Sequence, residues 1–469
     1  MQENSTTRIA AYISLTGLFV LCVASLLYYK ERMLFLDAPF IVYNIITEGR
    51  LYIQENRFGA FITQIVPLIG SKMHWPLKTI LLSYSLSFNL FYLSVGFILT
   101  FVLKQYRKTI LLCFYYLLFA SEAFFWTNNE VFQATAWMML AFGVLCYGQK
   151  STIHPFRLLL FTPLIFTAIF THAAIIPVVL LLCTYYLYIN NRFTQLSAKA
   201  FISIVIISTI AAKLVMSNTQ SYDSGKMHNA LYFSLHDIIS GLGSDFSKAF
   251  IKRCIYNYWA ASILFIYGMT SIFIRRQYKL FSICLLGTIG YYVLICLVFG
   301  NLTDHHLFYI ESEMMGMVII MCLPFVYYVL PAMKPAQALA VIAIVLAGRF
   351  VYIYHSAQKY TARVTLTTEI LTWMNKQGVK KLAIAEDEPV KNIMIEPWAA
   401  AAESIILSSM SNKPDVSFYF VKDSTTVPKD KYIYAGCFYN YKPEDMNTRY
   451  FSIDTTTEYT IKHLNEIVP

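Results

Sequence analysis

The chain has 469 residues, of which 57% are hydrophobic and 14% charged, and its mean hydropathy is +0.52. This composition excludes an ordinary soluble protein and predicts a multi-span membrane protein. The formal net charge of +10 does not indicate a nucleic-acid partner, because the excess basic residues fall in short loops between apolar runs. The nine cysteines lack paired spacing, so neither a disulfide framework nor a zinc site is predicted.

Apolar runs of the length that crosses a bilayer recur along the chain. We expect a mainly α-helical bundle of about eleven spans, the first of them a retained span rather than a cleaved signal peptide. The fifth and sixth are expected to form a hairpin that turns at His172. The expected spans are Ile9–Tyr29, Lys78–Leu103, Thr109–Trp126, Val131–Tyr147, Leu158–Phe170, Ala173–Ile189, Ala200–Met216, Tyr258–Ile274, Leu280–Phe299, Glu313–Leu330 and Ala336–Tyr354.

Basic residues gather in alternate loops, which is the positive-inside pattern for a cytoplasmic N-terminus. Of the thirteen acids before His355, all but Glu3 fall in or beside the other loops, so we expect the polar chemistry on the outer face. The basic residues of the expected internal loops are Lys104, Arg107, Lys108, Lys150, Arg157, Arg192, Lys199, Arg275, Arg276, Lys279 and Lys334.

The first outer loop, Leu34–Gln64, is polar and charged although it lies between two spans. Pro39–Glu48 and Leu51–Phe58 are expected to be short interfacial helices, each followed by a glycine. Asp37 is the candidate catalytic residue, because a carboxylate above an apolar cavity can take a proton from an acceptor hydroxyl. Capping of the following helix is an equally good reason for Asp37, and the two roles are compatible.

Several charged residues near the outer face are candidate substrate-binding groups. Arg50 and Arg57 are expected on one face of the second short helix, with Glu48 on another, and either snorkelling at the interface or phosphate binding would explain the arginines. Lys213 and Arg349 lie inside apolar runs, where charged side chains usually face a cavity or a partner. They could surround an anionic group together with His172, although a structural histidine is the commoner case.

The outward loop from Gly300 to Glu313 concentrates polar residues. Its acids and histidines could hold a divalent cation, which is therefore a candidate cofactor, or the histidines could bind phosphate. The metal ligands themselves cannot be assigned from the sequence. The candidate binding residues in this loop are Asp304, His305, His306 and Glu311.

Residues 355–469 are expected to form a small α/β domain outside the membrane, separate from the transmembrane domain of residues 1–354. We expect a helix at Thr361–Gln377, strands at Lys380–Glu386, Val416–Val421 and Tyr432–Gly436, and a helix at Trp398–Met410. Nothing in this tail indicates catalysis.

Four features together resemble the GT-C superfamily of multi-span glycosyltransferases. They are Asp37 soon after the first span, "ENRFGAFITQIVP" at Glu55–Pro67, the "FTHAAIIP" turn at Phe170–Pro177, and a soluble outer tail. Many members carry one acid or a double acid in the first outer loop. Asp37 matches that place as a single acid. The lack of a second acid beside it argues against a metal-dependent variant, unless Glu48 or Asp304 supplies a second carboxylate.

The resemblance implies a hexosyl- or pentosyltransferase that moves a sugar, with inversion, from a polyprenyl-phosphate carrier to a glycan, lipid or protein acceptor. The reaction would occur on the outer face of a membrane, which we expect to be a bacterial inner membrane. Asp37 would be the general base, and Arg57, Lys213, Arg349 or the histidines would stabilise the leaving phosphate.

Three other functions remain open from the sequence. A glycan polymerase or ligase of the O-antigen type would use the same carriers, but would be expected to have a larger outer loop than residues 217–256. A secondary transporter would need polar residues near the middle of several spans, whereas the acids here gather at one face. An assembly protein would not need Lys213 and Arg349 within apolar runs.

Overall fold

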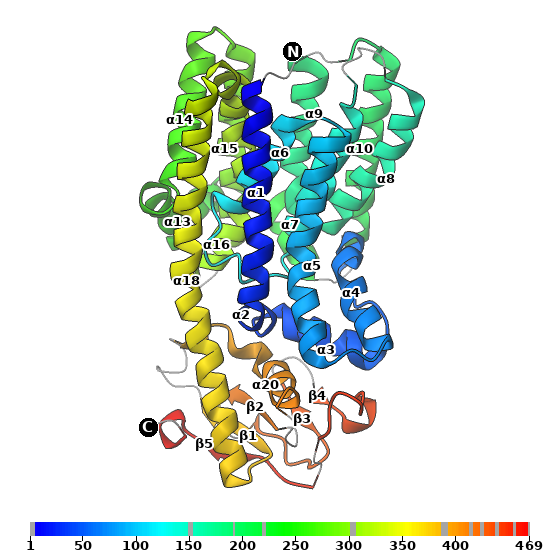
Figure 1. The fold of residues 1–469 in the computed structure, drawn as a ribbon, viewed down its shortest axis with the longest axis vertical. Helices are drawn as coiled ribbons and strands as arrows, with labels where there is room; N and C mark the ends of the chain where they lie inside the picture. The colour runs from blue at the N-terminus through cyan, green and yellow to red at the C-terminus, as the bar shows by residue number, and fades with distance from the viewer. Residues whose placement is uncertain are drawn as a thin grey trace.

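The computed structural model describes residues 5–148, 153–190, 193–217, 222–300, 306–385, 393–411, 416–422, 426–436, 440–453 and 456–467. The protein is mainly helical, with a long bundle and a small domain at one end of it (Figure 1). The helices of the first half are α1 (Ser5–Leu27), α2 (Tyr29–Met33), α3 (Asp37–Glu48), η1 (Phe58–Ala60), α4 (Phe61–Lys72), α5 (Leu77–Phe97), η2 (Ile98–Val102), α6 (Tyr106–Leu117), α7 (Glu130–Leu145), α8 (Pro155–Thr171), η3 (Ala173–Ile175), α9 (Ile176–Thr184), η4 (Tyr185–Ile189) and α10 (Leu196–Ser217). The second half of the bundle contains α11 (Tyr222–Leu231), α12 (Leu235–Gly243), α13 (Asp245–Tyr256), α14 (Trp259–Ile274), α15 (Tyr278–Phe299), α16 (Leu307–Met314), α17 (Gly316–Pro324), η5 (Phe325–Val329), η6 (Leu330–Ala332) and α18 (Pro335–Gln377).

Several helices are long and apolar enough to cross a membrane, as the composition predicts. Within the described residues there are five such helices by length and composition, or up to eight if each bent helix pair is one span. The expected eleven spans are therefore not confirmed. One reason is that the third expected span ends early: α6 has only 12 residues, and an irregular segment replaces its second half.

Three helix pairs bend sharply where the sequence interrupts the apolar pattern. The predicted hairpin at His172 is confirmed, because α8 and the helix that follows it meet at 118°. His172 is extended at this turn, and its Nδ1 accepts a hydrogen bond from the Ala174 N–H at 3.2 Å. The other pairs are α13 with α14 at 81° and α16 with α17 at 53°.

The first outer loop agrees with the sequence in its first half only. Helix α3 ends at Glu48, and Gly49 takes the left-handed conformation at φ 65° that such an end favours. The expected helix at Leu51–Phe58 is wrong: residues 51–57 are not helical, because Glu55 and Asn56 also have positive φ, at 50° and 55°. The chain instead becomes helical at η1 and continues into α4.

Helix α18 links the bundle to the tail. Its 43 residues correspond to about 65 Å, roughly twice the thickness of a bilayer core. The helix expected at Thr361–Gln377 is the second half of α18, and it ends before Gly378, which has φ 69°. No break in α18 marks residue 355, so the tail continues directly from the bundle on a continuous helix.

The tail combines a small sheet with one longer helix. Strands β1 (Lys381–Ala385), β2 (Ser417–Val421) and β5 (Thr460–Lys462) form a parallel sheet in the order β2-β1-β5, in which Leu382 pairs with Phe418. Helix α20 (Ala400–Ser409) packs on β2, and β3 (Tyr434–Ala435) pairs with β4 (Asn440–Tyr441). Short helices are η7 (Pro397–Ala399), η9 (Pro443–Asp445) and η10 (Leu464–Glu466).

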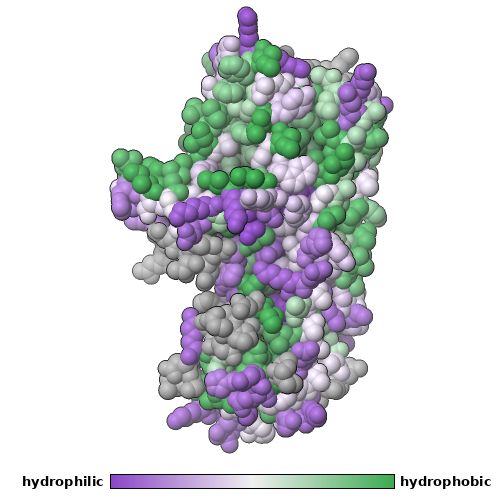
Figure 2. Space-filling view, turned by 90° about the vertical axis from the view of Figure 1, so that its left-hand side faces the viewer, coloured by the Kyte–Doolittle hydropathy of each residue, from purple (hydrophilic) through white to green (hydrophobic). Residues whose placement is uncertain are grey.

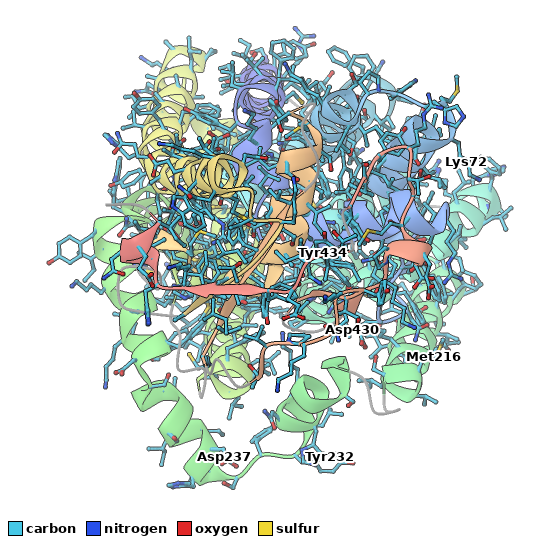
Figure 3. The ribbon with its side chains drawn as sticks, turned by 90° about the horizontal axis from the view of Figure 1, so that it is seen from below. Lys72, Met216, Tyr232, Asp237, Asp430 and Tyr434 are labelled. Carbon is cyan, nitrogen blue, oxygen red and sulfur yellow. The ribbon has the colours of Figure 1, made fainter. Side chains whose placement is uncertain are left out.

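The tail lies across the end of the bundle that carries the first outer loop (Figures 1 and 3). The ring of Tyr43, on α3, contacts the rings of Tyr441 and Phe451 with centroids 4.4 and 5.0 Å apart. The side-chain amide of Asn447 donates to the Ile46 carbonyl at 3.0 Å. Helix α3 is therefore held between the bundle and the tail.

Candidate functional site

Asp37 is the first residue of α3, at the junction of the bundle and the tail. Its side chain is partly buried, and its Oδ2 accepts a hydrogen bond from the indole N–H of Trp126 at 2.8 Å. The preceding residue, Leu36, has φ 52°, a strained conformation for a leucine. Leu36 is the N-cap residue of α3, and Asp37 lies in the first turn of that helix. Asp37 is therefore the first helical residue rather than the N-cap, and a carboxylate in the first turn still favours the N-terminus of a helix.

The positive charges of two basic side chains lower the pKa of the Asp37 carboxyl. Burial raises the pKa of Asp37 above its ordinary value, while the Trp126 hydrogen bond and the positive charges of Arg57 and Lys226 oppose that rise. Arg57 is held by Glu130, with Nη1 and Oε2 2.7 Å apart and both side chains 13% exposed. The ammonium of Lys226 lies 4.7 Å from the centre of the Phe299 ring. The region thus combines one poised carboxyl with cationic groups.

Trp126 belongs to the irregular segment between α6 and α7, residues 118–129, which we call the connecting segment. Buried charged side chains fix this segment from α18. Arg349, 2% exposed, donates to the Ala120 carbonyl in this segment at 2.7 Å and to the carbonyl of Leu117, the last residue of α6, at 2.9 Å. Lys359 pairs with the Glu122 carboxylate at 2.9 Å. The contacts that the structure gives Arg349 are those of a structural anchor, and its binding of a ligand stays a prediction.

Two further charged residues fix the connecting segment from α2 and α16. Arg32 donates to the Phe124 carbonyl at 2.6 Å and is 2% exposed. Glu311, fully buried, accepts from the backbone N–H groups of Ser121 at 2.8 Å and Ala123 at 2.7 Å. Irregular backbone can be buried in this way only when such partners satisfy it. These interactions hold Trp126 where its indole reaches Asp37.

A second group of predicted residues meets at the stretch that carries Arg57. Lys213, 1% exposed, donates to the Glu55 carbonyl at 3.2 Å, and its ammonium lies 5.8 Å from the centre of the Phe170 ring. The Phe170 ring stacks on Phe58 with centroids 5.7 Å apart. The structure therefore brings Lys213 and the turn before His172 to the same irregular stretch that carries Arg57.

The remaining predicted residues are placed differently. Arg50 and Glu48 form a pair at 2.7 Å with 78% and 30% of their side chains exposed, so the pair lies in water. The ring of His306 stacks on Phe308, and Phe308 in turn packs edge to face on Trp126 with centroids 5.4 Å apart. His306 therefore approaches Asp37 through Phe308 and Trp126. Asp304 and His305 lie outside the described residues.

A metal site is not formed by the part of the chain that the structure describes. No group of three or more His, Cys, Asp or Glu side chains among those residues could hold a metal ion. The candidate ligands Asp304 and His305 fall in the gap between residues 300 and 306, so their loop remains a prediction.

Four site residues were not anticipated from the sequence: Trp126, Glu130, Lys226 and Arg32. The first two belong to the polar cluster "WTNNE", Trp126 to Glu130, at the end of an expected span. Such a polar cluster beside an apolar run is a usable signal for an irregular functional segment. Nothing local marks Arg32 or Lys226, because their partners are distant in sequence.

No protein family, curated protein or solved structure compared with the chain matches it.

Proposed function

We propose that the protein is a membrane glycosyltransferase of GT-C type that moves a sugar from a polyprenyl-phosphate carrier to a glycan, lipid or protein acceptor. The observation that carries the proposal is the Asp37 carboxyl, oriented by the Trp126 indole beside the charges of Arg57 and Lys226. A base and a cationic region are the two groups that displacement of a phosphate leaving group requires.

Asp37 would remove the proton from the acceptor hydroxyl while that oxygen attacks the anomeric carbon. The bond from the anomeric carbon to the phosphate oxygen breaks, and the carrier leaves as polyprenyl phosphate. Attack opposite the leaving group inverts the anomeric carbon. Arg57 and Lys226 would stabilise the departing phosphate, which gains charge as that bond breaks. The indole N–H of Trp126 would keep one carboxylate oxygen in place and leave the other for the proton.

For the topology, we propose about eleven passes, a cytoplasmic N-terminus and the tail on the outer side of a bacterial inner membrane. The asymmetry of basic loops supports this orientation. Figure 1 is consistent with it, because the N-terminus and the tail lie at opposite ends of the bundle. The short α6 and α7 would cross with the irregular connecting segment buried in protein, which membrane proteins tolerate.

The test is sugar transfer by the purified protein in liposomes containing polyprenyl-phosphate sugars, for Asp37→Asn and Asp245→Asn. Asp245 is a matched control, because it is an outer-loop aspartate that is 76% exposed and pairs with Lys248 at 3.2 Å. We expect Asp37→Asn to abolish transfer and Asp245→Asn to retain it. Transfer by the Asp37→Asn protein at the wild-type rate would remove Asp37 from the chemistry.

A glycan polymerase or ligase that uses the same carriers is the second candidate. Such an enzyme also needs a base and cationic groups on the outer face, so the arrangement around Asp37 suits it. The two functions differ in what the carrier delivers: a polymerase or ligase would transfer an oligosaccharide rather than a single sugar. Supplying carriers loaded with a single sugar and with an oligosaccharide in the same liposome assay separates the two, and solute flux without transfer would favour a secondary transporter.

A further inference from the structure

Helices α11, α12 and α13, residues 222–256, form what we call the lateral arm. In Figure 3 it projects away from the bundle, with Tyr232 and Asp237 on the projecting part. Large apolar side chains on it are exposed, among them Leu231 at 55%, Tyr232 at 71% and Leu235 at 72%. Exposed apolar side chains gathered on one element indicate a binding surface.

The apolar residues of α12 follow one stripe. Leu235, Ile238, Ile239 and Leu242 are spaced i, i+3, i+4 and i+7, which places them on a single face of a helix. A capping box fixes the start of α12: Ser234 accepts from the Asp237 N–H, and the Asp237 carboxylate accepts from the Ser234 N–H at 2.7 Å. The stripe therefore belongs to a well-formed helix.

The arm is fastened to the last turns of α15, one of the helices that can span a membrane. A Cβ on Gly241 would lie 2.8 Å from the Cys296 carbonyl oxygen, so α12 contacts α15 backbone to backbone. The hydroxyls of Ser247 and Tyr292 lie 2.6 Å apart. Because α15 ends at Phe299, these contacts hold the arm at the level where the expected span leaves the hydrocarbon.

The direction of the arm and its charges also match a bilayer surface. Helix α13 meets α14 at 81°, so α13 runs nearly across the direction of the adjoining apolar helix. Its exposed residues combine lysines with apolar groups, among them Lys248, Ile251, Lys252 and Ile255, and include Asp245, which pairs with Lys248 at 3.2 Å. Lysines on such a helix extend their ammonium groups to lipid phosphates while their stems lie among acyl chains.

Figure 2 shows a projection from the side of the molecule with hydrophobic residues along its upper edge, toward the apolar bundle. Hydrophilic residues lie along its lower edge, toward the tail. We propose that the lateral arm is a membrane-surface element that rests in the headgroup region of the outer leaflet, with the α12 stripe in the upper acyl chains. Lys226 lies on α11, and its charge lowers the pKa of Asp37. Contact of the arm with lipid would therefore set how deep the Lys226 ammonium lies in the membrane.

The test uses added tryptophans and brominated lipids in nanodiscs. Leu235→Trp places the indole on the stripe, and Ser240→Trp places it about 140° away around the same helix. Both positions are exposed, so neither change disturbs packing. The wild-type protein has six tryptophans, and its emission is subtracted. We expect shallow-brominated lipids to quench about half or more of the emission added by Leu235→Trp, and to leave that of Ser240→Trp almost unchanged.

Equal quenching of the two variants, or none in either, would overturn the proposal. A second copy of the chain is the other occupant that the stripe could accept. In that case the wild-type protein would be a dimer in nanodiscs that Leu235→Asp dissociates, and Leu235→Trp would stay unquenched. Neither result depends on whether the protein transfers sugar, so failure of this proposal is distinct from failure of the proposed function.

Discussion

Arg57 and Arg50 offer a matched comparison within one loop. Each arginine pairs with a glutamate at 2.7 Å, but the Arg57–Glu130 pair is 13% exposed on both sides, while the Arg50–Glu48 pair is 78% and 30% exposed. We expect a double-mutant cycle of Arg57→Gln with Glu130→Gln to give a coupling free energy of about 1.5–3 kcal/mol. The equivalent cycle for Arg50 and Glu48 should give less than about 1 kcal/mol.

The magnitude follows from solvent access, since distance and chemistry are the same in both pairs. A charge-assisted hydrogen bond away from water loses little to solvent screening, and removing one partner leaves the other charge desolvated. The Arg57 pair also joins the irregular stretch after α3 to the start of α7, whereas Arg50 and Glu48 are neighbours in sequence.

The assay is the free energy of unfolding in mixed micelles titrated with a denaturing detergent, for each single and double variant of both pairs. The reasoning predicts a larger coupling for Arg57 and Glu130 in every detergent and little dependence on salt. A coupling at Arg57 equal to or smaller than that at Arg50 would refute it, because burial would then not decide the strength of these pairs.

Three other changes test separate parts of the structure. Because burial raises the pKa of Asp37 and a base must be ionised, kcat/KM should fall as the pH decreases, and it should do so at pH values above the ordinary 3.8. For the same reason the ionised carboxyl lowers the stability of the folded protein, so Asp37→Asn should be at least as stable as the wild type at pH 7 in thermal melting. A loss of stability in Asp37→Asn at pH 7 would contradict the raised pKa. Gly59→Ala should cost about 1–3 kcal/mol, because its Cβ would lie 1.9 Å from a threonine hydroxyl oxygen, whereas Gly348→Ala, with no atom within 4 Å, should cost nothing in the same detergent titration. Glu403→Ala should destabilise the tail by about 3–5 kcal/mol, since it leaves Arg363 buried at 3% exposure without its carboxylate partner. Amide hydrogen exchange in α20 should then accelerate. Unchanged exchange would show that the pair of Arg363 and Glu403 does not stabilise the tail.

Local signals in the sequence were enough to predict several boundaries. Gly49 and Gly378 end helices because the backbone there takes the left-handed conformation, which glycine adopts most readily. Both helix ends are recognisable in the sequence from the glycine alone. The turn at His172 follows from a polar pair in an apolar run that is too short for two full spans. The strands at Lys381–Ala385 and Ser417–Val421 lie within their predicted ranges.

The errors arise where distant partners override local pattern. Leu51–Phe58 has the apolar spacing of a short helix, but Lys213 and Glu130 bind its backbone and its arginine, and the chain there adopts positive φ at Glu55 instead. Residues 118–126 of the connecting segment fall within the expected span Thr109–Trp126, because that run is apolar enough to cross a bilayer. Its irregular shape depends on Arg32, Arg349 and Glu311, which lie far from it in sequence.

The candidate site likewise contains one residue that local sequence predicts and one that it does not. Asp37 is predictable, because it is the first acid of the polar loop Leu34–Gln64 that follows the first apolar span. Its partner Trp126 is not, since nothing in the spacing of the two residues links a position on α3 to one before α7. A sequence can indicate which carboxylate lies near the interface, whereas the donor that orients it emerges only from the folded chain.

Release of the lipid carrier tests the central claim most directly. Purified protein in liposomes is supplied with a polyprenyl-phosphate sugar and an acceptor, and free polyprenyl phosphate is quantified by mass spectrometry alongside the glycosylated product. The account predicts one carrier released for each sugar transferred by the wild type and by Asp245→Asn, and none by Asp37→Asn. Release by Asp37→Asn at the wild-type rate, or product formed without release of the carrier phosphate, would contradict it.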